Sequence, residues 1–156
     1  MRFQDALDKQ GQEIERPPNM PVGTYRWMVS KHPVMDTIAD GRFDVVDFQL
    51  KCIEPLDDVD ADALDNYGTV QGKVMRHRFM FNTDPNEKAG FDRSLYNLKI
   101  FLREHLGLGE ELDKMSIKEA LAESVNREVL ASVSWRPDRN DPEIVYDQID
   151  RTAPVE

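Results

Sequence analysis

The sequence predicts a mainly β fold with a helical insertion. Apolar and polar residues alternate with a period of two in segments 23–32 and 43–53, as they do in half-buried strands. Leucines then recur at helical spacing within segment 92–106. Two more alternating segments follow the helical part. The predicted order is therefore three strands, one or two helices and two strands.

The first two strands are expected to pair as an antiparallel hairpin. Segment 43–53 has the clearest core face, and the turn signal Asp40-Gly41 precedes it. Cys52 lies on this face and is the only cysteine, which excludes an internal disulfide and favours a buried, inert thiol. The core face comprises Val46, Phe48, Leu50 and Cys52.

The third predicted strand, 70–82, interleaves basic and aromatic residues. Alternation places Phe79 and Phe81 on the core side and two arginines, Arg76 and Arg78, on the other. Cations bind phosphates and rings stack on bases, so this pattern is typical of a surface for single-stranded nucleic acid. A solvated strand face with the two rings in the core is the alternative interpretation.

The helical insertion has recognisable ends. Asp92 or Ser94 is expected to cap a helix that runs to about residue 105, and Ser116 a short helix over 117–123. The fourth strand, 128–136, places Trp135 on a core-like face, and segment 143–150 is the fifth strand.

This order predicts a five-stranded OB-like barrel with a helical insertion between strands 3 and 4. Residues 1–21, rich in proline near their end, are expected to form an extended arm. Residues 22–151 form the predicted OB-like nucleic-acid-binding domain, and residues 152–156 a loose tail.

Charge is unevenly distributed along a chain whose net charge is −10. Segment 54–66 holds six acidic residues and no Lys or Arg, whereas segment 70–106 holds seven basic and four acidic residues. Any binding to nucleic acid must therefore rest on a local groove. No apolar run approaches the roughly 18 residues of a spanning helix, and residues 1–8 lack a signal-peptide core, so a cytoplasmic location without membrane contact is expected.

The motifs of common enzymes are missing from the sequence. There is no Gly-rich phosphate loop, no His-Glu-x-x-His and no nucleophile elbow, and the three histidines lie far apart in the chain. The acidic segment lacks the central glycine and terminal glutamate of a calcium loop. The sequence thus predicts neither catalysis, nor a metal site, nor a cofactor.

A nucleic-acid site is expected on strands 1 to 3. Phosphates would contact Lys73, Arg76 and Arg78, with Lys51 at the rim. Bases would lie near the first strand, where alternation leaves open whether Arg26 or the Tyr25–Trp27 pair faces outward. The full expected set is Tyr25, Arg26, Trp27, Lys51, Lys73, Arg76 and Arg78.

Several weak motifs are arranged in a familiar layout. Pro-x-Gly-x-Tyr at 21–25 opens the first strand, and Arg-Phe-x-Phe-Asn at 78–82 closes the third. A Leu-rich helix at 95–102 and Asp-x-x-Asp-Pro-Glu at 138–143 follow. Over about 22–151 this layout resembles phage-encoded, OB-fold single-stranded DNA-binding proteins. Unlike many replication proteins of this type, the chain does not end in a long acidic tail.

The resemblance implies sequence-tolerant binding of single-stranded DNA in phage replication or recombination, in the host cytoplasm. It also implies contacts with replication proteins and with further copies of the chain. Two alternatives stay open. One is a structural or adaptor protein of a phage particle, and the other is an acidic inhibitor that mimics nucleic acid and occupies a basic cleft of a host enzyme.

Overall fold

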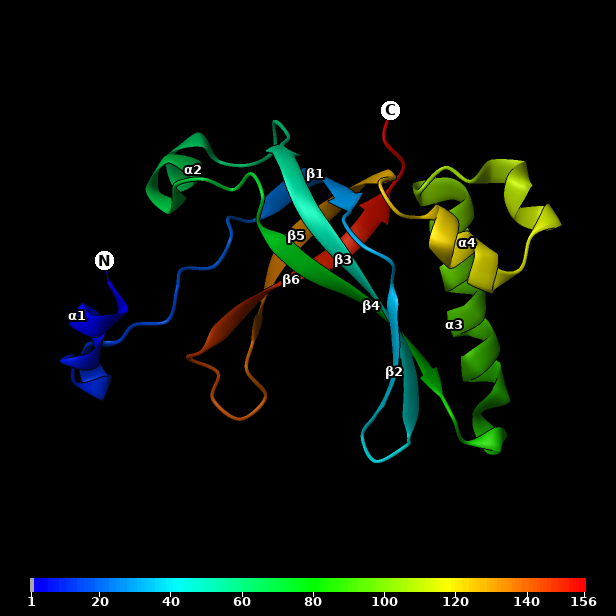
Figure 1. Ribbon diagram of the computed structural model, residues 1–156, viewed down its shortest axis with the longest axis horizontal. Helices are drawn as coiled ribbons and strands as arrows, with labels where there is room; N and C mark the ends of the chain where they lie inside the picture. Colours follow the sequence, from blue (N-terminus) through cyan, green and yellow to red (C-terminus); the bar gives the residue numbers. More distant parts are fainter. Residues whose placement is uncertain (1) are drawn as a thin grey trace.

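The computed structural model, which describes residues 2–156, is an α+β fold built on one six-stranded antiparallel sheet (Figure 1). The strands follow the order β2-β3-β1-β5-β6, and β4 pairs with the other edge of β3. Their bounds are β1 Gly23–Val29, β2 Val34–Ile38, β3 Phe43–Pro55, β4 Val74–Asn82, β5 Glu128–Pro137 and β6 Val145–Ala153.

The long strand β3 organises the sheet. On one edge its first half pairs with β2 and its second half with β1, while β4 follows the opposite edge. β2 replaces part of the expected connection between the first two strands. Its residues are almost all exposed, so no hydrophobic alternation marks it in the sequence. The turn 39–42 that joins β2 to β3 was predicted correctly, and Ala39, Asp40 and Gly41 have positive φ there.

The helical insertion lies between β4 and β5, as predicted. A short 3₁₀ turn, Pro85–Glu87, leads into α3, Lys88–Ile100, which continues as a π-helical turn over Phe101–His105. α3 starts earlier than expected, at Lys88, and neither Asp92 nor Ser94 caps it; the Asp84 side chain caps the preceding 3₁₀ turn by accepting from the N–H of Asn86. A second 3₁₀ turn, Gly109–Lys114, precedes α4, Ile117–Glu123. Ser116 caps α4 by accepting from the N–H of Glu119, as its sequence predicted.

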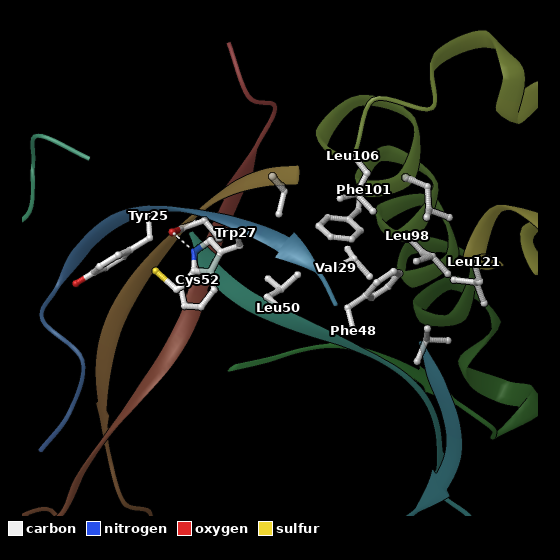
Figure 2. Packing of buried hydrophobic residues seen from close by; sticks show 14 of the residues in the cluster. Tyr25, Trp27, Val29, Phe48, Leu50, Cys52, Leu98, Phe101, Leu106 and Leu121 are labelled. Carbon is white, nitrogen blue, oxygen red and sulfur yellow. Dashed lines mark hydrogen bonds between the residues drawn. The ribbon is translucent and has the colours of Figure 1, made fainter. Parts of the chain in front are cut away.

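The core lies between the sheet and the insertion. Tyr25, Trp27 and Val29 of β1 pack with the predicted face of β3 and with Leu98, Phe101, Leu106 and Leu121 (Figure 2). Phe81 is buried and Phe79 packs against the core, which confirms their predicted side of β4. Cys52 is buried, and burial raises the pKa of its thiol to about 11, so it stays protonated at neutral pH.

The expected five-stranded barrel is wrong in two respects. The sheet has six strands, because β2 forms within the segment that was expected to be only a connection between the first two strands. Within residues 2–156, no ladder joins β4 to β6, so the sheet does not close into a barrel. This open junction between β4 and β6 is called the seam below.

The acidic connection between β3 and β4 contains α2, Ala61–Tyr67, which Asp60 caps. The expected arm, of which Met1 lies outside the described residues, contains α1, Phe3–Leu7, and a 3₁₀ turn, Gly11–Glu13. In Figure 1 the arm projects at one end of the long axis, while α3 and α4 cover the sheet at the other end.

Candidate nucleic-acid interface

The first candidate surface is the face of β3 and β4 that points away from the helices. Cross-strand register places Lys51 opposite Val74, Gln49 opposite Arg76 and Asp47 opposite Arg78. We call this surface the strand face. It includes a shallow groove of about 360 Å³, and the groove residues beyond these strands are Lys31 and Val34.

Arg78 is held by an acidic neighbour on the strand face. Its Nε and Nη2 donate to the two carboxylate oxygens of Asp47 at 2.7 and 2.9 Å. The guanidinium lowers the pKa of Asp47, and the carboxylate raises the pKa of Arg78. A phosphate would have to compete with this bidentate pair. Arg78 is therefore less available to a phosphate than the sequence predicts.

Arg26 is placed between two carboxylates. Its Nη2 lies 3.2 Å from Glu54 Oε1, and its Nε lies 3.5 Å from Glu128 Oε1. The Nε is buried and donates no hydrogen bond, so the guanidinium is positioned by charge more than by directed bonds. With two anionic partners, Arg26 offers little net attraction to a further anion.

The rings of Tyr25 and Trp27 are core residues, with exposed fractions of 0%. The Tyr25 hydroxyl donates to the Pro21 carbonyl at 2.7 Å, and Trp27 Nε1 donates to the Ala131 carbonyl at 3.0 Å, the bond drawn in Figure 2. Burial raises the pKa of Tyr25. Their expected place beside bases is wrong, because the core face of β1 is the Tyr25–Trp27 face.

Three of the expected cations are exposed: Lys51, Lys73 and Arg76. Arg76 and Lys51 belong to the strand face, whereas Lys73 precedes β4 and its Nζ lies 5.8 Å from the centre of the Tyr67 ring. The structure thus brings together only part of the expected set, and it adds Lys31, for which the sequence shows no distinguishing pattern.

A second candidate surface is the β5–β6 hairpin. Trp135 is 49% exposed, contrary to its expected core position, and its Nε1 donates to the Met20 carbonyl at 2.7 Å. Tyr146 is 37% exposed, and the guanidinium of Arg16 lies over its ring at 4.2 Å. A hollow of about 410 Å³ is lined by Tyr146 of β6, by Arg136 near the end of β5, and by Asp138 and Arg139 of the turn.

We call Arg16, Trp135, Arg136, Arg139 and Tyr146 the hairpin surface. Alternation places Trp135 on the same side of β5 as buried residues. It does not show that the core ends before Trp135, so the sequence did not predict this surface. The available signal was its position beside a turn with two arginines.

Other classes of site find little support in residues 2–156. No group of three or more His, Cys, Asp or Glu side chains there is placed to hold a metal ion. None of the helices in that range has the length and apolar character needed to cross a bilayer. A comparison with known protein families and with curated proteins finds no match for this chain.

Proposed function

We propose that the protein binds single-stranded DNA with little sequence preference. The observation that carries the proposal is the hairpin surface, where the exposed Tyr146 ring lies beside Arg16 and Arg136 and the exposed Trp135 lies on the other face of the same hairpin. A stacked base contributes about 1–3 kcal/mol and every base has a π-face, so such a surface binds without reading sequence. The phosphates of the same DNA strand would contact Lys31, Lys51 and Arg76 of the strand face.

We further propose that the sheet is an OB-like fold left open at the seam. If β1 and β2 are counted as one interrupted strand, the strand order supports that assignment. β3 and β4 are then the second and third OB strands, and the β5–β6 turn is the loop between the last two. In OB folds the second and third strands and this loop bind oligonucleotides, which is the placement of the two candidate surfaces. A role in phage replication or recombination rests on the sequence resemblance alone.

Tryptophan fluorescence tests the proposal directly, because one tryptophan is exposed and the other is buried. Titration with a dT oligonucleotide should quench the emission, and Trp135→Phe should remove most of that quench. Trp27→Phe, checked for an intact fold by its melting curve, should retain it. An absence of quench and of a gel shift at low salt, or equal binding to duplex DNA, would contradict the proposal.

The salt dependence gives an independent measurement. Loss of two phosphate contacts should reduce the slope of log K against log salt by about 1.4, since each single-strand contact contributes about 0.7. The double variant Lys51→Ala/Arg76→Ala is the test, and Arg93→Ala, an exposed cation on α3, is the control. Assembly without DNA, or binding to a basic protein alone, would instead favour one of the two alternative functions.

A further inference from the structure

A pocket of about 580 Å³ opens at the seam, between β4, β6 and the helical insertion. β4 has two different faces here. His77 and Phe79 line the pocket, while Arg76 and Arg78 point to the strand face on the other side of the sheet. The pocket is therefore separate from the proposed DNA surface.

Aromatic rings form one side of the pocket. The ring centres of His77 and Phe79 are 4.9 Å apart, and both lie close to Phe101, at 5.1 and 5.3 Å. Tyr96 of α3 is exposed and adds a ring at the pocket. The faces of such rings attract cations, and most strongly where water is partly excluded.

Two carboxylates complete the lining. Glu104 comes from the π-helical turn and Asp150 from β6, and both residues are exposed. Among residues 2–156 neither of them forms an ion pair with a Lys, Arg or His side chain. The pocket therefore has two negative charges that no cation of the described chain neutralises.

The two histidines of the pocket do not supply a compensating charge. Burial, with a smaller effect of His105, lowers the pKa of His77 to about 4, and burial also lowers the pKa of His105. His105 Nδ1 is hydrogen-bonded to the Thr152 hydroxyl at 2.7 Å, which fixes the orientation of the His105 ring. At neutral pH His77 is uncharged and one of its ring nitrogens is an acceptor.

We propose that the seam pocket binds the side chain of an arginine from a partner protein. The guanidinium would lie against the aromatic rings and donate to Glu104 and Asp150. Arginine fits better than lysine, because its planar group both stacks on rings and bonds carboxylates in a fixed fork. A nucleic acid fits worse, because its phosphates would approach two unpaired carboxylates. The proposal goes beyond DNA binding and does not depend on it.

The probe is Nα-acetyl-arginine amide, added to the full-length protein while the imidazole signals of His77 and His105 are followed by NMR. A ligand of this size should bind with a Kd on the order of 1 mM. The exposed His32, which is outside the pocket, serves as the internal reference. The neutral isostere Nα-acetyl-citrulline amide and thymidine are the matched comparison ligands.

Arginine amide should shift His77 and His105 saturably, and citrulline amide should bind at least tenfold more weakly. Glu104→Gln/Asp150→Asn should weaken arginine binding about tenfold, because each lost carboxylate removes an attraction typical of partly exposed pairs. Glu110→Gln/Glu111→Gln, which removes two exposed carboxylates elsewhere, should bind like the original protein.

Three results would overturn the inference: no shift with arginine amide, equal binding of the citrulline compound, or shifts with thymidine instead. If the Gln/Asn variant has a lower melting temperature, its weaker binding could reflect a damaged fold. The comparison of the three ligands on the original protein then decides whether the pocket binds arginine. Failure of the dT quench leaves this result untouched, so the two proposals fail separately.

Discussion

At the residue scale, the environment of a side chain decides which of several identical groups is available to a ligand. Arg76 and Arg78 lie two positions apart on β4 and share a face, yet only Arg78 has a carboxylate opposite it in register. The two tryptophans differ in the same way, since Trp27 is sealed in the core and Trp135 lies where the hairpin extends beyond it. These differences depend on cross-strand partners that composition does not show.

His77 provides a prediction on pH. Its pKa is about 4 in the folded protein and near 6.5 when the group is unperturbed. The unfolded chain therefore takes up the proton first as pH falls, and stability drops from about pH 6.5 downward until the folded chain also binds it near pH 4. The loss approaches about 3 kcal/mol across this window.

The measurement compares urea unfolding of the original protein and His77→Phe between pH 7 and pH 4. The variant should lose less stability on acidification, because it lacks the titrating ring. Carboxylates elsewhere, as well as His105, Glu104 and Asp150 around the pocket, are common to both proteins and cancel in the difference. Parallel stability curves would show that the His77 pKa is not depressed.

At the element scale, the start of β1 requires a glycine at its first residue. Gly23 has φ of +142°, a conformation that side chains rarely adopt. A Cβ there would lie 2.5 Å from Val59 Cγ2 and 3.1 Å from the Val59 Cα. Since one of these atoms is backbone, rotation of the Val59 side chain alone does not remove the clash.

Gly23→Ala should therefore destabilise the protein by about 2–4 kcal/mol, from backbone strain and overpacking together. Thermal or urea unfolding measures the change. Gly11→Ala is the matched control, since a Cβ at Gly11 meets nothing within 4 Å. Val59→Ala in the Gly23→Ala background should recover part of the loss, and an unaltered melting temperature in the single variant would contradict the close approach.

Elements also differ in how well the sequence predicts them. Alternation correctly gave the core face of β3, and the Ser116–Glu119 pattern correctly gave α4, because both signals are local. β2 was missed since its exposed residues carry no burial pattern. Of the candidate site, the exposed cations Lys51, Lys73 and Arg76 could be predicted from residue type. The pairing of Arg26 and Arg78 could not, because it depends on register between strands distant in sequence.

At the scale of the whole molecule, residues 2–15 of the arm are nearly independent of the folded body. The described hydrogen bonds of residues 2–15 all stay within the arm, and contact with the body begins at Arg16 and Asn19, which donate to the Val145 carbonyl. Met20 is 1% exposed, and its N–H donates to Asp147. The anchor of the arm therefore lies at its end nearest β1.

Removal of the arm through Glu15 should change the free energy of unfolding by less than about 0.5 kcal/mol, as for surface changes in general. Met20→Ala, which keeps the full arm, should cost about 2–5 kcal/mol through the cavity it leaves. Urea unfolding of both variants tests this. A large loss in the truncated protein would mean that residues before Arg16 pack on the body.

The open seam also bears on how the protein behaves at high concentration. β4 and β6 each keep an edge that no other described strand pairs, and such edges are templates for aggregation between molecules. Both edges have features that hinder pairing with a strand of another molecule. α3 packs along β4, while β6 has charges at Asp147, Asp150 and Arg151 and is followed by Pro154, which has no N–H to donate. The molecule can thus leave its sheet unclosed and still resist growth into fibrils.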